Sequence, residues 1–290
     1  MVDYVRFLNE TIAKNKLTRK QVIEIFHLSG YEELAKVDDI TLSRWLNGKS
    51  SPNLYKKLLT ISCLKGDMPE FIKQVNIKEV QENIKDRDFI LSYFRKVDNA
   101  HNAINYTARS ASRRIELESL TYDEVAERFR VFHQNFSSYD AITRKLKMSF
   151  KGKGTLISCL EAGQVVGHIA YFQCKSVKIG TRKLSNVLYF TPVHYSDSNV
   201  LKDLLLEFFV HYVNESIGDF HYSIGLTRSG DKLNFHTYLG NGVTLEFFPP
   251  EESEKISESD KGLFLIKVDL IRYLSRKIFI EEVNHRLNDK

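Results

Sequence analysis

The sequence has few cysteines, the residues that would mark a disulfide-bonded secreted chain or a zinc-stabilised chain. Its 290 residues include only three cysteines, and also only five prolines and one tryptophan. Cys63, Cys159 and Cys174 are far apart and show no CxxC spacing. We therefore expect reduced thiols in a hydrophobic core, and neither a disulfide framework nor a zinc site.

Long apolar runs are also missing. The most apolar helix candidate, residues 203–213, is interrupted by Glu207 and is far shorter than the ~20 residues that a membrane span needs. The N-terminus, MVDYVRFLNE, carries charge from its third residue and has no apolar segment typical of a signal peptide. These features predict a cytoplasmic protein with no membrane partner.

Neither sign of charge dominates. The formal net charge is +5 and the pI is about 8.9, with 42% hydrophobic and 27% charged residues. This composition is ordinary for a globular chain, and its length favours two domains. The mild basicity is compatible with a nucleic-acid partner but does not by itself argue for one.

The histidines do not form a metal-binding pattern. His168, His194, His221 and His236 have no ligand spacing with one another or with acidic residues. We expect no metal site, and interpret these side chains as core or rim residues of a sheet.

The first 66 residues read as short helices with apolar residues at helical spacing. Thr18 is a candidate N-cap for a helix that runs to about residue 26, and Asp38 or Asp39 caps the helix that carries Trp45. Gly48 suits the left-handed position that ends that helix. Trp45 is expected to anchor the helix to a core.

Polar and cationic residues gather at the starts of two of these helices. A helix-turn-helix needs such residues there, because its second helix reads base edges in the major groove and the flanking groups hold phosphates. The candidate DNA-binding residues are Thr18, Arg19, Lys20, Ile40, Thr41, Ser43, Arg44, Lys49 and Ser50.

The same stretch resembles the phage-repressor (Cro-like, XRE) DNA-binding family over about residues 4–66. The matched pattern comprises Ser43, Arg44, Trp45, Gly48, Lys49, Pro52 and Leu59. The resemblance implies an all-α helix-turn-helix domain that binds double-stranded DNA as a dimer. It further implies that Ile40, Thr41 and Arg44 read bases, while Arg19, Lys20 and Lys49 hold phosphates. A protein-interaction module is the alternative for these helices.

A change of pattern follows a polar helical connector. From about residue 115 onward, apolar runs at 155–161, 165–174 and 184–192 read as strands joined by hairpins. Residues 199–217 read as an amphipathic helix, and residues 251–261 as an acidic solvated loop. We expect an α/β domain with a mixed, largely antiparallel sheet.

The strands and helices of residues 116–270 resemble the GNAT acyltransferase fold. Of that family's C-terminal signature, this chain keeps Tyr238 and Gly242. The resemblance implies that Tyr238 would be the general acid of an acyltransferase. It also implies a glycine-rich loop before the helix at residue 199, where backbone N–H groups would hold the pyrophosphate of acetyl-CoA.

That loop differs from the family pattern. Residues 193–199 contain no glycine, and Asp197 would repel a phosphate. The sequence therefore predicts a GNAT-like domain that does not bind acetyl-CoA and has no other cofactor.

Together these patterns predict a helix-turn-helix domain at residues 1–68, a helical connector at 69–114 and a GNAT-like domain at 115–290. The favoured function is a sequence-specific, homodimeric transcriptional regulator whose GNAT-like domain dimerises or senses a small-molecule or protein effector. The alternative is a GNAT-type acyltransferase with a DNA-binding targeting domain, Tyr238 as acid and acetyl-CoA as cofactor. A scaffold in which the second domain only binds other proteins is a third interpretation.

Overall fold

A computed structural model describes residues 4–81, 83–101, 112–131, 152–179, 181–227, 230–249 and 262–289. The chain divides into two compact units. Unit 1 comprises Met1–Asn83, Phe209–Asp219 and Ile271–Lys290, and unit 2 comprises Ile84–Phe208 and Phe220–Leu270. The predicted linear order of residues 1–68, 69–114 and 115–290 differs from this division, because unit 1 also takes in two later segments.

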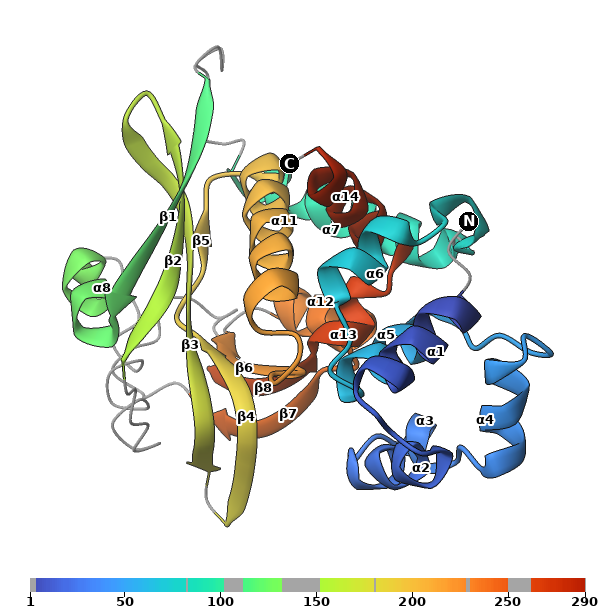
Figure 1. The fold of residues 1–290 in the computed structure, drawn as a ribbon. Coiled ribbons are helices and arrows are strands. Elements are labelled where there is room, and N and C mark those ends of the chain that lie inside the picture. Colours follow the sequence, from blue (N-terminus) through green and yellow to red (C-terminus); the bar gives the residue numbers. More distant parts are fainter. Residues whose placement is uncertain are drawn as a thin grey trace. The chain divides into compact units, whose positions relative to one another are not determined.

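Unit 1 is helical. Its first segment contains α1 (Tyr4–Lys14), α2 (Arg19–Leu28), α3 (Glu32–Ala35), α4 (Asp39–Leu46), α5 (Leu54–Cys63), α6 (Met68–Gln74) and the short 3-10 helix η1 (Ile77–Glu79). The later segments supply the end of α11 (Ser198–Glu215), most of α13 (Leu270–Leu274) and α14 (Lys277–Asn288). These elements are labelled in Figure 1.

The later segments of unit 1 bond directly to the N-terminal helices. The buried Ser62 hydroxyl donates to the backbone oxygen of Ile217 at 2.7 Å. The Asn284 amide on α14 donates to the backbone oxygen of Ile72 on α6 at 2.6 Å. A separate N-terminal helix-turn-helix domain is therefore not shown, since its helices share one unit with residues far along the chain.

The predicted local signals in these helices are confirmed. Thr18 caps α2 in a capping box with Gln21, and the Asp38 side chain caps α4 by accepting from the Thr41 N–H. Gly48 has a φ of 68°, and Trp45 is buried. These signals act within one helical turn, so they do not depend on which segments complete the core.

Unit 2 is built on a mixed sheet. Its elements are α7 (Ile84–His101), β1 (Arg113–Thr121), α8 (Tyr122–Arg128), β2 (Lys153–Glu161), β3 (Gln164–Ile179), β4 (Arg182–Phe190), β5 (His194–Tyr195), the first part of α11, β6 (Tyr222–Thr227), α12 (Gly230–Gly240), β7 (Val243–Phe248) and β8 (Leu263–Asp269). The strand order is β1-β2-β3-β4-β6-β8-β7, and β5 pairs with β3. The parallel pair is β4 with β6, and the remaining pairs are antiparallel.

Both faces of this sheet are packed. One face buries Phe172, Tyr189 and Ile224 in a common apolar cluster. On the other face, the Phe208 ring of α11 meets the rings of Tyr171 and Phe190 edge-on at 5.1 and 4.9 Å. This contact holds the second half of α11 against β3 and β4; the three elements are labelled in Figure 1.

The predicted α/β class and the largely antiparallel sheet are confirmed, including the strands expected at 155–161, 165–174 and 184–192. Strand β1 was not predicted: Ile115 and Leu117 are two residues apart, but Ser119 and Leu120 interrupt the apolar alternation that would mark a strand. The acidic loop predicted at 251–261 lies outside the described residues.

Candidate functional site

The start of α11 is capped by the residue that precedes it. The Asp197 Oδ1 atom accepts from the backbone N–H groups of Asn199 at 2.9 Å and Val200 at 3.1 Å. The backbone oxygen of Asp197 accepts from the Leu201 N–H at 3.1 Å. These N–H groups of the first turn of α11 are therefore hydrogen-bonded to acceptors within the chain.

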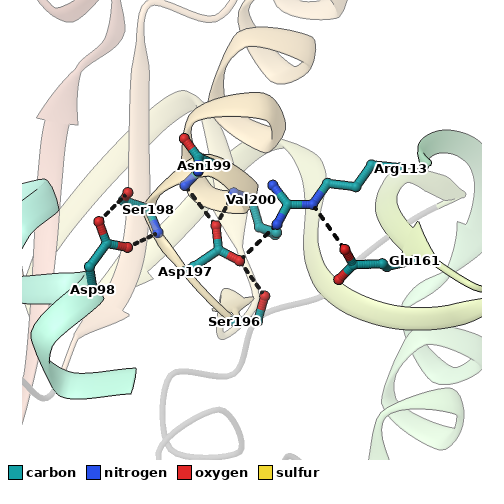
Figure 2. Close-up of polar contacts among 8 residues, drawn as sticks. All are labelled: Asp98, Arg113, Glu161, Ser196, Asp197, Ser198, Asn199 and Val200. Atoms are coloured by element: carbon teal, nitrogen blue, oxygen red, sulfur yellow. Dashed lines mark hydrogen bonds and ion pairs between the residues drawn. The ribbon is translucent and has the colours of Figure 1, made fainter. Parts of the chain in front are cut away.

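A second carboxylate reaches the same turn from α7. The Asp98 Oδ1 atom accepts from the Ser198 N–H at 2.9 Å, and Asp98 Oδ2 accepts from the Ser198 hydroxyl at 2.8 Å. Figure 2 shows this pair beside the Asp197 cap. Two carboxylates therefore lie where the positive end of the helix dipole favours negative charge.

One cation balances part of this charge. The Arg113 guanidinium on β1 donates to Asp197 Oδ2 at 3.1 Å, and its Nε lies 3.8 Å from Glu161 Oε1 on β2 (Figure 2). The Ser196 hydroxyl also donates to Asp197 Oδ2, at 2.8 Å. The Asp197 side chain is only 3% exposed, so it is a buried carboxylate with a full set of partners. We call Asp98, Arg113, Glu161, Ser196, Asp197 and Ser198 the α11 network.

The parallel strands β4 and β6 part at their carboxyl ends. The register of β4 with β6 runs from Val187 opposite Tyr222 to Phe190 opposite Gly225. Beyond it, the Thr191 N–H donates to Ala170 of β3 at 3.0 Å, whereas β6 continues to Thr227 alongside β8. In open α/β sheets, ligands bind where neighbouring strands diverge in this way.

A buried hydroxyl lies at this point. Thr227 is 7% exposed, and within the described part of the chain its Oγ1 atom has no hydrogen-bond partner. Strand alternation places its side chain on the face opposite Ile224, which is the face that α11 covers. Leaving a buried hydroxyl unpaired costs free energy, so the position calls for an explanation.

The predicted acid, Tyr238, lies on α12. Its hydroxyl donates to Asp86 Oδ1 of α7 at 2.8 Å, and its ring packs 4.3 Å from that of Phe89. The same helix holds His236, whose burial, together with the nearby Lys232, lowers its pKa to about 4. Its imidazole is therefore neutral near pH 7.

The predicted DNA-binding residues lie on unit 1. Those on α2 and past α4 are exposed, as are Ile40 and Arg44 on α4, while Thr41 and Ser43 are partly buried. The exposed residues of the set are Thr18, Arg19, Lys20, Ile40, Arg44, Lys49 and Ser50. The Thr18 side chain and the Asp38 carboxylate already accept N–H groups at the starts of α2 and α4.

The thiols are free, as predicted. Cys159 and Cys174 are buried, Cys63 is partly buried, and no disulfide joins them. Burial raises the pKa of Cys63 and of Cys174 to about 11. Across the described ranges, no group of three or more His, Cys, Asp and Glu side chains could hold a metal ion. Nor is any helix in those ranges long and apolar enough to cross a membrane.

The α11 network does not fit the diphosphate of coenzyme A. The N–H groups that would hold a phosphate at this turn are taken by Asp98 and Asp197. The Arg113 guanidinium pairs with Asp197 and is also approached by Glu161, so the α11 network has more carboxylates than cations among its members. A diphosphate would have to displace these acceptors and enter a region of like charge.

No family model matches the chain, and no curated protein matches it. Solved structures do match. LasI, an AHL (acyl-homoserine lactone) synthase, has a TM-score of 0.37 and 10% identity over 58% of this chain and 95% of LasI. BjaI, a CoA-dependent acyl-homoserine lactone synthase solved with SAM and isopentyl-CoA, has a TM-score of 0.37 and 14% identity over 62% of this chain and 100% of BjaI. An N-acetyltransferase from Staphylococcus aureus Mu50 has a TM-score of 0.31 and 17% identity over 55% of this chain and 99% of its own.

These matches correct the favoured prediction. The matched structures are acyltransferases and acyl-homoserine lactone synthases, in agreement with the predicted GNAT-like fold. The prediction of a sequence-specific DNA-binding transcriptional regulator is wrong, and no XRE helix-turn-helix domain is shown. The physical reason for the error is that the cationic helix starts were read without the segments that complete their unit.

Sequence reasoning missed most of the site. Asp98 and Arg113 were not singled out, because each bonds to a residue 100 or 84 positions away. Asp197 was recognised as unfavourable for phosphate, but its role as a cap was not. Thr227 carries no sequence signal, since its importance comes from burial without a partner.

Proposed function

We propose that unit 2 is an acyltransferase that moves an acyl group from a thioester to a nucleophile at the carboxyl ends of β4 and β6. The observation that carries the proposal is the buried Thr227 hydroxyl, which has no hydrogen-bond partner among the described residues where the two parallel strands part. A substrate oxygen placed there would satisfy it.

The hydroxyl suits a carbonyl oxygen. When a nucleophile bonds to the carbonyl carbon of a thioester, negative charge develops on the oxygen, and a preorganised donor stabilises that charge. The Thr227 O–H would donate to this oxygen, and the attacking amine would lose a proton to water. The C–S bond would then break and the departing thiolate would take a proton, which gives an amide and a thiol. Burial strengthens such a hydrogen bond because water is excluded.

Tyr238 remains the proposed source of that proton. Its hydroxyl donates to Asp86, so the ring is held in one orientation and the hydroxyl is linked to a carboxylate. Replacing Tyr238 by Phe tests this role separately from that of Thr227.

Thiol release from acyl thioesters tests the proposal. The full chain is incubated with short- and medium-chain acyl thioesters and a panel of primary amines, and free thiol is followed with a disulfide reagent. The protein's own background is expected to be low, because burial raises the pKa of Cys63 and Cys174 to about 11. We expect amine-dependent release above that of buffer.

Three variants give the assignment its control. Thr227→Val should lower kcat about 100- to 1000-fold, as loss of one preorganised donor does. It should not lower the melting temperature, because no hydrogen bond within the described residues is lost. Thr227→Ser should keep most of the activity, and Thr244→Val, at an exposed threonine of β7, should keep all of it. Absence of release with every donor, or full activity in Thr227→Val, would overturn the proposal.

A further inference from the structure

The N–H groups at the start of α11 are already bonded within the chain. Asp98 and Asp197 accept hydrogen bonds from the N–H groups of Ser198, Asn199 and Val200. The following N–H, of Leu201, bonds to the backbone of Asp197. No N–H of this first turn is left for an outside anion, and an anion site at a helix start depends on such groups.

The charge around the turn points the same way. Asp197 is buried and paired with Arg113 at 3.1 Å, and Arg113 is itself approached by Glu161 at 3.8 Å. Asp98 adds a further carboxylate within hydrogen-bonding distance of Ser198. Three carboxylates against one guanidinium leave a net negative charge, which repels a diphosphate more strongly in a partly buried site than in water.

The contacts are also mutually supporting. Asp98 lies on α7, Arg113 on β1, Glu161 on β2 and Asp197 before α11, so four elements of unit 2 meet in one network (Figure 2). Displacing the buried Asp197 would leave the Arg113 guanidinium without its main partner, which makes displacement by a ligand costly. The network is therefore a built part of the unit and holds the helix start closed.

We infer that the donor is an acyl thioester recognised through its acyl group and the amide-bearing arm next to the sulfur, with no contribution from a nucleotide diphosphate. This inference rests on the proposed acyl transfer and specifies its substrate class. Among the described residues, Leu226 and Thr227 of β6 pair with β8 but have no partner on β4. An amide-bearing arm can add to such a strand edge, whereas the N–H groups at the start of α11 are already bonded.

The test compares two donors that carry the same acyl group. Acyl-CoA contains the diphosphate, and acyl-pantetheine lacks it. For the full chain we expect kcat/KM values within about fivefold of each other, and thermal shifts with CoA no larger than those with pantetheine. A preference for acyl-CoA above about fivefold, or a thermal shift specific to CoA, would overturn the inference. No thiol release from either donor would instead count against the proposed function, so the two failures are distinguishable.

Replacing Asp98 tests whether the α11 network is what prevents the diphosphate from contributing. Asp98→Ala removes one carboxylate and frees the Ser198 N–H, so we expect the ratio of kcat/KM for acyl-CoA over acyl-pantetheine to rise about three- to tenfold. Asp123→Ala removes an exposed carboxylate from the first turn of α8 and should leave the ratio unchanged. If the ratio is unchanged in Asp98→Ala, the α11 network is not what excludes the diphosphate, and the assignment is overturned.

Discussion

Helices α4 and α11 are both capped by an aspartate side chain, which is exposed to solvent at α4 and buried at α11. Asp38 caps α4 by accepting from the Thr41 N–H at 2.7 Å, and its side chain is exposed. Asp197 caps α11 by accepting from two N–H groups, and its side chain is almost completely buried beside Arg113. The first is a local cap in solvent, and the second belongs to a network of four elements.

The comparison teaches what decides whether a helix start can hold an anion. A helix cap and a bound phosphate compete for the same N–H groups. Residue types around a helix start suggest an anion site, but the structure shows whether the chain has already used the N–H groups. At α4 the cap uses one of them, and at α11 Asp98 and Asp197 use all of the first turn's.

The largest effect is expected if α4 is separated from the later segments of the chain that belong to unit 1. A fragment of residues 1–83 lacks Phe209–Asp219 and Ile271–Lys290, which belong to unit 1. It loses the bonds from Ser62 to Ile217 and from Asn284 to Ile72 and exposes the apolar surface beneath them. We expect no cooperative unfolding transition in circular dichroism, because the buried surface no longer offsets the chain entropy.

The full-length chain provides the matched control. There, Ser62→Ala removes only one buried hydrogen bond and should lower the free energy of unfolding by about 1–2 kcal/mol. A fragment that unfolds cooperatively with the midpoint of the full chain would show that the N-terminal helices are an independent domain after all.

The next largest effect is expected at the buried cap. Asp197→Ala removes the acceptor for the Asn199 and Val200 N–H groups and leaves Arg113 without its main partner. We expect the free energy of unfolding, measured in urea, to fall by about 2–4 kcal/mol, since both a cap and a buried ion pair are lost.

A more conservative substitution separates the contribution of the helix cap from that of the ion pair with Arg113. Asp197→Asn keeps an oxygen for the N–H groups but removes the charge that pairs with Arg113, so its loss should be roughly half as large. If Asp197→Ala changes stability by less than about 0.5 kcal/mol, the network does not hold α11 and the contrast with Asp38 disappears.

A feature could be predicted from the sequence when the residues that make it are close together along the chain. Thr18, Asp38 and Gly48 act within one turn, and their predicted roles are confirmed. The strands of β2, β3 and β4 follow from hydrophobic patterns of a few residues and are also confirmed. Unit membership is different, because it depends on contacts such as Ser62 with Ile217, which are 155 positions apart.

The site shows the same limit. Asp98 meets Ser198, and Arg113 meets Asp197, only after the sheet and α7 have formed. Neither pairing leaves a periodic pattern in the sequence. The absence of glycine at residues 193–199 could be read directly, and it led to the expectation that this helix start does not hold acetyl-CoA. The use of these N–H groups by two carboxylates could not be read in the same way, because one of the carboxylates comes from α7.

The smallest effect is expected at the exposed cap, and pH isolates it. The hydrogen bonds from Thr41 hold the pKa of Asp38 below its ordinary value of 3.8. A carboxyl whose pKa is lower in the folded state stabilises the fold above its unfolded pKa, and that contribution is lost as the pH falls through the folded value. The difference in melting temperature between the wild type and Asp38→Ala should therefore be constant above about pH 5 and shrink below about pH 4. Asp38→Asn keeps the cap oxygen and has no carboxyl to protonate, so its melting temperature should fall less over the same range. A wild-type advantage over Asp38→Ala that is the same at pH 3 as at pH 7 would show that the charge of Asp38 contributes nothing, which would leave the buried Asp197 as the only one of the two caps whose charge stabilises its helix.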